Sequence, residues 1–256
     1  MEEVKTLIVT GGAGHLGKAI ARWWARLPGI QIVLIDRDKD RLAKAGASLV
    51  DLGAVVVPLA IDVTVPDALK AAIASLPKSL WSTPPSLIVA HALSGKDSGG
   101  RSPRLGGLEF EAFREVLDAN LTSVLFAIDR LLPYMRQAGG GRIVLVSSTA
   151  GVSASATAAH AYSLSKAGVA ALPRLLAPEL AASGVLINAV APGKFANPDW
   201  PDDPEKVKRY ERSVPLGRLA SAEEVAALIG FLSSGANSYV TGQTIVQDGG
   251  RLSAIG

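Results

Sequence analysis

The stretch that decides the fold is TLIVTGGAGHLG, residues 6–17. Its first five residues are an apolar run that predicts a buried strand. Glycines follow at once, and the pattern of residues 15–27 predicts a helix. A helix therefore begins directly after the carboxyl end of a strand, with a flexible turn between the two.

Three glycines of this turn have distinct tasks in a dinucleotide-binding unit. Gly12 permits the tight turn, Gly14 lets the backbone approach a pyrophosphate, and Gly17 allows close helix packing. The N–H groups at the start of the helix then face the phosphates. An acidic residue about twenty positions further on completes the pattern, and Asp36 stands there after a second predicted strand at 31–35. We expect this unit to bind a dinucleotide.

Asp36 also bears on which dinucleotide binds. A carboxylate at the end of the second strand can hold both ribose hydroxyls and would repel a 2′-phosphate. NAD(H) is therefore the predicted cofactor, ahead of NADP(H). Arg37 keeps NADP(H) open, because a neighbouring arginine can accommodate that phosphate. The competing interpretation of Asp36, a cap at a helix entry, does not explain its place after a strand.

Strands and helices alternate along the 256 residues. Further apolar runs predict strands at 54–57, 86–90, 141–147, 185–190 and 243–247, with helices at 39–52, after 64, and in two stretches within 109–137. The strands are apolar throughout, as expected when helices cover both faces of a parallel sheet. We predict one α/β domain, residues 1–256, built on a Rossmann-like doubly wound parallel sheet of about seven strands.

Composition narrows the classes of function. Hydrophobic residues make up 48% of the chain, enough for a substantial core. The formal charge is only +3 and no basic run stands out, so we expect no nucleic-acid partner. The absence of cysteine excludes disulfides, thiolate catalysis and cysteine-bound zinc. We expect no metal site, because the three histidines lie far apart in the sequence.

The sequence also bears on location. No apolar run reaches the length that spans a membrane, so no membrane partner is expected. The first residues, MEEVK, are acidic and lead directly into a strand, unlike a signal peptide. We therefore expect a cytoplasmic protein.

A second motif, YSLSK at residues 162–166, indicates the chemistry. Helix positions four apart share a face, so the Tyr162 phenol and the Lys166 ammonium can reach the same small volume. A fixed cation favours phenolate and lowers the phenol pKa from its ordinary value of about 10. Such an acid/base can exchange a proton with an alcohol or ketone. With a dinucleotide as hydride partner, the two motifs predict a nicotinamide-dependent oxidoreductase.

Residues 6–250 resemble the short-chain dehydrogenase/reductase family, in the branch whose chains have about this length. The motifs that carry the resemblance are TGGAGHLG at 10–17, Asp62-Val63, Asn120 in DANLTSVLF, Ser148 in GRIVLVSSTAG, Tyr162 and Lys166 in YSLSK, Pro192-Gly193 in NAVAPG, and YVTGQTIVQDGG at 239–250. The resemblance implies that these motifs together form one unit that binds a coenzyme and carries out catalysis.

The resemblance also implies roles for single residues. Tyr162 would be the acid/base, Lys166 would lower its pKa and hold the nicotinamide ribose, and Ser148 would bond the reacting oxygen. Asn120 would anchor a water that links Lys166 to solvent. The implied cofactor-binding set is Gly11, Gly12, Gly14, His15, Leu16, Gly17, Asp36, Arg37, Asp62, Val63, Ala90, His91, Ala92, Tyr162, Lys166, Pro192, Gly193 and Phe195.

Two of these assignments leave alternatives open. The hydroxyls of Ser147, Ser148 and Thr149 are adjacent, and spacing alone does not choose among them. Asn120 can equally be a helix cap or a mid-helix side chain bonded to backbone.

Several positions depart from the family pattern. Ala90-His91-Ala92-Leu93 replaces Asn-Asn-Ala-Gly, whose asparagines tie the central sheet together, so we expect that tie to be made differently here. Leu93 is expected to narrow the substrate pocket. The glycine turn resembles that of the longer, sugar-nucleotide-modifying branch. Pro173 and Pro178 predict a bend or break in the helix beyond Lys166.

We therefore predict an NAD(H)-dependent enzyme that interconverts a secondary alcohol and a ketone. Its small-molecule substrate would be a sugar, polyol or hydroxy acid, or a 3-oxoacyl thioester. The alternatives are a sugar-nucleotide epimerase or dehydratase and a non-catalytic dinucleotide sensor. Residues 194–213, with Trp200 and Tyr210, predict a lid over the substrate. The resemblance implies a homotetramer or homodimer.

Overall fold

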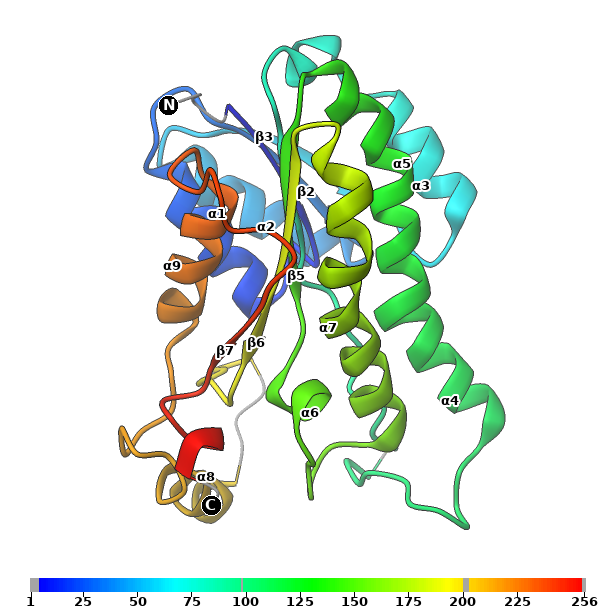
Figure 1. Cartoon of the computed structure of the whole chain (residues 1–256), viewed down its shortest axis with the longest axis vertical. Helices are drawn as coiled ribbons and strands as arrows, with labels where there is room; N and C mark the ends of the chain where they lie inside the picture. The colour runs from blue at the N-terminus through cyan, green and yellow to red at the C-terminus, as the bar shows by residue number, and fades with distance from the viewer. Residues whose placement is uncertain (1–4, 98, 200–202, 255–256) are drawn as a thin grey trace.

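A computed structural model of the chain describes residues 5–97, 99–199 and 203–254. Within these ranges the strands form one seven-stranded parallel sheet in the order β3-β2-β1-β4-β5-β6-β7 (Figure 1). The strands are β1 (Thr6–Thr10), β2 (Gln31–Asp36), β3 (Val55–Ala60), β4 (Ser86–Val89), β5 (Gly141–Val146), β6 (Val185–Pro192) and β7 (Thr244–Gln247). The predicted doubly wound sheet is confirmed.

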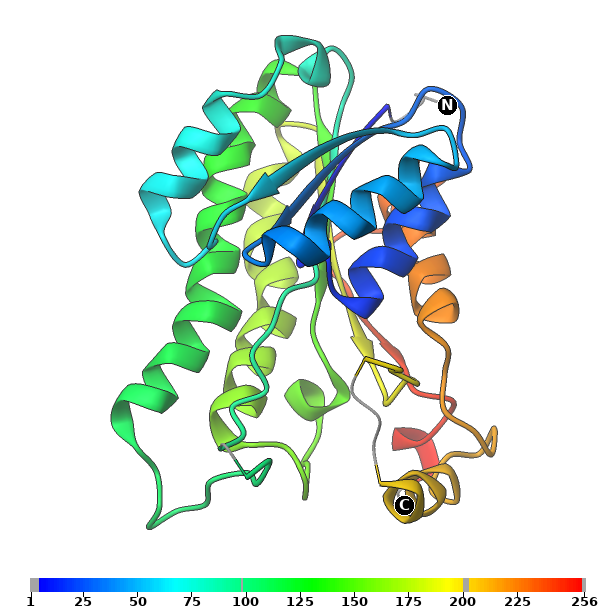
Figure 2. The same ribbon diagram turned by 180° about the vertical axis from the view of Figure 1, so that it is seen from behind.

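Helices cover both faces of the sheet (Figures 1 and 2). One face carries α1 (His15–Ala25), α2 (Lys39–Val50) and α9 (Ala222–Ser233). The other carries α3 (Pro66–Ala74), α5 (Ser123–Gln137) and α7 (His160–Ala181). The remaining elements are α4 (Phe110–Leu117), α6 (Thr149–Val152), α8 (Pro204–Glu211), a π-helical turn (Asp118–Thr122) and two 3₁₀ turns (Lys78–Trp81 and Leu252–Ala254). In the part of the chain that the structure describes, no helix combines the length and apolarity needed to cross a membrane.

The central strands are apolar throughout because both of their faces are buried. In β1, Leu7 and Val9 pack into the core beneath α1, α2 and α9, whereas Ile8 packs into the core beneath α3, α5 and α7. Successive side chains of a strand point to opposite faces, so one short run supplies both cores. Each fully buried aliphatic side chain of this kind stabilises the fold by roughly 1.5–3 kcal/mol.

The third strand contains a proline. Residues 54–57 were predicted to begin this strand, and β3 runs from Val55 through Pro58 to Ala60. In the described sheet β3 pairs with β2 alone and is therefore an edge strand. A proline, which lacks a backbone N–H, is tolerated at such an edge.

The sequence predicted a bend or a break in the helix that carries Tyr162 and Lys166, and the break is not found. α7 runs from His160 to Ala181 through both Pro173 and Pro178. The Thr244 hydroxyl donates a 2.7 Å hydrogen bond to the Ala170 carbonyl, three residues before Pro173. This bond ties β7 to α7 in the turn of the helix that precedes Pro173.

We expect Thr244→Val to destabilise the fold by about 1 kcal/mol, because it removes this hydrogen bond and retains the side-chain shape. Urea unfolding measures the change as a lower transition midpoint. Thr157→Val, at an exposed position, is the control. An unchanged midpoint in Thr244→Val would show that the bond does not support α7.

Candidate active site

A cleft of about 1040 Å³ opens at the carboxyl edge of the sheet. It spans the junction of β1 and β4, neighbouring strands whose connections leave in opposite directions. Open α/β sheets bind their ligands at this kind of switch point. Every residue predicted to bind the cofactor lines this cleft except Gly12, and every predicted catalytic residue lines it except Asn120.

The glycine turn, residues 11–17, forms a cradle on the cleft wall, and its backbone packs too closely for side chains at two of its glycines. Gly11 has a φ of +69°, and a Cβ there would lie 2.7 Å from the His91 backbone nitrogen. A Cβ on Gly17 would collide with the Gly11 carbonyl oxygen. Gly12 faces the other way, toward the Leu34 side chain, which explains its absence from the cleft wall.

The start of α1 is suited to an anion. Its N-cap residue is Gly14, without a capping side chain, and the first turn holds no acidic residue. The first N–H groups of a helix have no partner within the helix and carry the positive end of its dipole. The cradle and this helix end therefore fit the pyrophosphate of a dinucleotide.

Asp36 joins the end of β2 to the glycine turn. One carboxylate oxygen accepts a hydrogen bond from the Ala13 backbone N–H at 3.1 Å, and the other accepts from Asp38 at 3.2 Å. The N-cap of α2 is Asp38, whose side chain accepts from Arg41. The alternative interpretation of Asp36 as a helix cap is thus wrong, and each of its oxygens retains a lone pair for a ribose hydroxyl.

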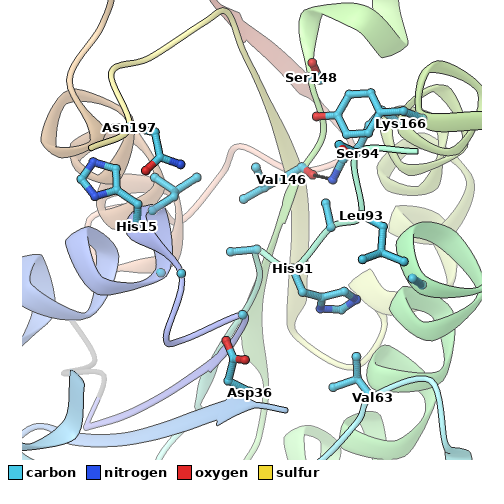
Figure 3. A pocket seen from close by; sticks show the side chains of 18 of the residues that line it. His15, Asp36, Val63, His91, Leu93, Ser94, Val146, Ser148, Lys166 and Asn197 are labelled. Carbon is cyan, nitrogen blue, oxygen red and sulfur yellow. Dashed lines mark hydrogen bonds between the residues drawn. The ribbon is translucent and has the colours of Figure 1, made fainter. Parts of the chain in front are cut away.

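The opposite wall holds the proposed acid/base group. Figure 3 shows Ser148 and Lys166 on one side of the cleft, His15 and Asn197 on the other, and Asp36 below. Ser148 follows β5, and its side chain accepts a hydrogen bond from the Ala150 backbone N–H at 3.2 Å. It also opposes the rise in pKa that burial causes in the Tyr162 phenol.

The three adjacent hydroxyls at 147–149 are now distinguished. The Ser147 hydroxyl is buried and donates to the Lys166 carbonyl at 2.7 Å, so it joins β5 to α7. Thr149 does not line the cleft. Ser147 and Ser148 both line the cleft, and Ser148 is the one whose hydroxyl acts on the pKa of Tyr162.

The predicted lowering of the Tyr162 pKa by Lys166 is wrong. Burial raises the pKa of the Tyr162 phenol, and the hydrogen bond with Ser148 offsets only part of this. The Lys166 ammonium lies 5.9 Å from the Tyr162 ring centre and donates a 2.7 Å hydrogen bond to the Val146 carbonyl. Burial also lowers the pKa of Lys166 to about 8. Both groups are shifted toward their neutral forms, because removal from water opposes charge.

Asn120 lies in the π-helical turn between α4 and α5 and is fully buried. Its side chain accepts from the Leu93 backbone N–H at 2.6 Å, and donates to the Leu93 carbonyl at 2.8 Å and to the Ser165 hydroxyl at 3.0 Å. Both amide donors are thus occupied by protein groups, and they hold the loop after β4 against α7. The role of Asn120 in a water relay stays a prediction.

His91 makes hydrogen bonds across the central sheet, in place of the asparagines of the family pattern. Its Nδ1 lies 2.7 Å from the Thr10 hydroxyl and its Nε2 lies 2.7 Å from the Ser123 hydroxyl. Ser123 already donates its proton to the Ala119 carbonyl, so it accepts from Nε2–H, and Thr10 donates to Nδ1. Burial, followed by the charge of Lys166, lowers the pKa of His91 to about 4. A neutral imidazole therefore joins β1, the loop after β4 and α5.

The sequence missed a cluster at the mouth of the cleft. Asp199, on the loop after β6, pairs with Arg41 of α2 at 2.9 Å and with Lys18 of α1 at 3.4 Å. Arg41 and Asp199 both line the cleft. No local pattern could have revealed this pair, because the two residues are 158 positions apart.

Comparisons with known proteins agree with this geometry. A family model described as Enoyl-(Acyl carrier protein) reductase matches residues 11–251. The 2-dehydro-3-deoxy-L-rhamnonate dehydrogenase (NAD(+)) of Sphingomonas sp. is 34% identical over 247 residues, 95% of this chain and 94% of the relative. The cis-4-hydroxycyclohexanecarboxylate dehydrogenase of Sinomonas cyclohexanicum is 37% identical over 251 residues, 96% of each. A 3-oxoacyl-[acyl-carrier protein] reductase with bound NAD from Brucella melitensis has a TM-score of 0.88 and 31% identity, covering 97% of this chain and 91% of that one.

The state of His91 predicts how stability depends on pH. The folded protein keeps His91 neutral down to a pKa of about 4, whereas the unfolded chain takes up the proton near 6.5. The unfolded state binds more protons between these values, so the free energy of unfolding falls as the pH drops from 6.5 to 4. We expect His91 to contribute roughly 3 kcal/mol to this fall.

Denaturant unfolding of the coenzyme-free protein at several pH values measures the effect. His91→Asn should remove this part of the slope, and His160→Asn, in the first turn of α7, should retain it. Equal slopes in the wild type and in His91→Asn would contradict the assignment.

Proposed function

This chain belongs to the short-chain dehydrogenase/reductase family of oxidoreductases, and we propose that it interconverts a secondary alcohol and a ketone with NAD(H) as coenzyme. The observation that carries the proposal is the arrangement of one cleft. Its wall beyond β5 holds Ser148, Tyr162 and Lys166, and its wall beyond β1 and β2 holds the glycine cradle and Asp36. A proton-transfer group and a dinucleotide site thus share one cavity.

In this proposal Tyr162 donates a proton to the ketone oxygen, or accepts it from the alcohol in the reverse direction. Ser148 holds the same oxygen and stabilises the charge that develops on it. NAD(H), when bound, supplies or accepts the hydride. The raised pKa of Tyr162 keeps the phenol protonated at neutral pH, ready to donate. Lys166, with a pKa of about 8, still carries most of its charge there and favours the phenolate as it forms.

The coenzyme preference rests on Asp36. Its carboxylate lines the cleft and would accept from ribose hydroxyls and repel a 2′-phosphate. Two arginines, Arg37 and Arg41, line the same part of the cleft and could attract that phosphate. Arg41, however, is engaged by Asp199, which favours NAD(H). One relative is NAD-dependent and one neighbour binds NAD, whereas another neighbour, the L-sorbose reductase of Gluconobacter frateurii, binds NADPH. The proposed preference therefore rests on Asp36 and on the pairing of Arg41 with Asp199.

For the substrate we propose a hydroxy acid, or a sugar or polyol, ahead of a 3-oxoacyl thioester. Two of the relatives act, by their names, on compounds with a carboxylate. Lys96 lines the cleft on the loop that also carries Leu93 and Ser94, and it could pair with such a carboxylate. The matched relatives share the length of this chain, which disfavours the sugar-nucleotide epimerase with its added substrate domain.

Three further features belong to the proposal. Residues 194–213 would form a lid that includes α8, although Trp200 lies outside the described residues. Exposed leucines on α5 and α7, namely Leu125, Leu164 and Leu175, suit contact between subunits of a homodimer or homotetramer. Action in the cytoplasm stays a prediction from the sequence.

We expect Tyr162→Phe to lower kcat by about 10²- to 10⁴-fold, because it removes the proton-transfer group. NADH absorbance with a panel of hydroxy acids, sugars and polyols measures turnover, and calorimetric titration measures NAD binding, which should persist. Tyr239→Phe, at a residue that is 95% exposed, is the matched control. Full turnover in Tyr162→Phe would rule out this acid/base, and a wild type that binds NAD without any turnover would favour the sensor.

We expect Asp36→Ala to weaken NAD binding and to relax discrimination against NADP, because the variant loses both the ribose acceptor and the negative charge. The ratio of the NAD and NADP dissociation constants is the measurement. Asp38→Ala removes a neighbouring carboxylate that caps α2 and does not line the cleft, so it should leave the ratio unchanged. An unaltered ratio in Asp36→Ala would contradict the ribose role.

A further inference from the structure

Tyr210, near the end of α8, reaches the turn that follows β6. Its phenol oxygen accepts a hydrogen bond from the Lys194 backbone N–H at 2.8 Å. The preceding N–H, that of Gly193, donates to the Gln247 carbonyl at 2.9 Å and so extends the ladder between β6 and β7. Tyr210 thus supplies the acceptor for the first N–H of the turn beyond that ladder.

The phenol packs directly on the backbone of this turn. A Cβ on Gly193 would lie 3.0 Å from the Tyr210 hydroxyl and 3.1 Å from the Asp248 Cα. A side chain at position 193 would be tightly crowded at these distances. Glycine at this position therefore allows the Tyr210 hydroxyl and the Asp248 backbone to approach the turn closely. The turn is therefore held between Tyr210 on α8 and the segment after β7.

The Tyr210 ring is itself held by its surroundings. The Arg251 guanidinium lies 4.9 Å from the ring centre and the Lys194 ammonium lies 5.9 Å from it. Cations at these distances are attracted to an aromatic ring. Arg251 also donates a 2.9 Å hydrogen bond to the Ser213 hydroxyl, just after α8. The hydroxyl is thus held in place by contacts within the protein.

The turn belongs to the catalytic end of the cleft. β5 and β6 are neighbours, and the ladder continues past β5 through the bond from the Ser147 N–H to the Val190 carbonyl. Ser148 and Gly193 therefore follow adjacent strands at one edge, and both line the cleft, whereas Asp36 ends β2 on the far side of β1 and β4. Under the proposed function the nicotinamide must lie at the end that holds Tyr162, beside this turn.

We propose that Tyr210 is a positioning residue, whose hydroxyl fixes residues 192–194 in the conformation that receives the nicotinamide end of the coenzyme. This inference rests on the proposed function. Tyr210 acts through the backbone of the turn. When the protein itself holds the turn in the binding conformation, less conformational entropy is lost as the coenzyme binds, and the affinity for the coenzyme is higher. The effect is confined to the nicotinamide end, because the glycine cradle and Asp36 serve the other end.

Titration calorimetry with NAD and with ADP-ribose, which lacks the nicotinamide, separates these ends. In Tyr210→Phe the ring and its two cations remain and one hydrogen bond is lost, so the NAD dissociation constant should rise about three- to tenfold. The dissociation constant of ADP-ribose should not change. Gly193→Ala, whose added methyl pushes on the Tyr210 hydroxyl, should show the same selective loss. Tyr239→Phe should alter neither constant, and thermal unfolding verifies that each variant is folded.

The two dissociation constants distinguish a positioning role of Tyr210 from a purely structural one. A loss for NAD alone supports the positioning role. Equal losses for NAD and ADP-ribose would assign Tyr210 a purely structural role and overturn the inference, and so would unchanged affinity for both. If the wild type binds neither ligand, the proposed function itself fails and the inference falls with it.

Discussion

The close approach of β1 and β4 at their carboxyl ends is the constraint on which the site depends. Gly11 has no side chain, and its backbone packs against the His91 backbone. The His91 imidazole then joins Thr10 on β1 to Ser123 on α5. The imidazole is kept neutral because burial and the nearby charge of Lys166 oppose its protonation. This junction is the switch point, so the same contacts that close the sheet define the floor of the cleft.

The catalytic wall shows how burial and charge compete. A cation near a phenol lowers its pKa, but removal of both groups from water opposes their charged forms. Here burial dominates, since the Lys166 ammonium is turned toward the Val146 carbonyl and the pKa of Tyr162 is raised. The site is therefore poised with a neutral phenol. In the proposed reaction, hydrogen bonding from Ser148 and the charge of Lys166 assist as negative charge develops on the phenol.

Contacts from outside the central sheet keep the two ends of the cleft in place. At one end Asp199 bridges the loop after β6 to Arg41 and Lys18. At the other end Tyr210 supports the turn after β6 from α8. The segment from the end of β6 through α8 thus contacts both the glycine-turn end and the Ser148 end of the cleft.

The sequence by itself determined the order of strands and helices, the glycine turn with Asp36, and the pairing of Tyr162 with Lys166 on one helix. These features are local, because apolar runs, glycines and four-residue spacing act within a few residues of chain. Only the tertiary structure decided that the Ser147 hydroxyl is used up by the Lys166 carbonyl, that His91 replaces the asparagines of the family pattern, that α7 continues through Pro173, and that the Tyr162 pKa rises. Each of these depends on groups distant in sequence, since hydrogen-bond partners and desolvation are set by everything packed around a side chain.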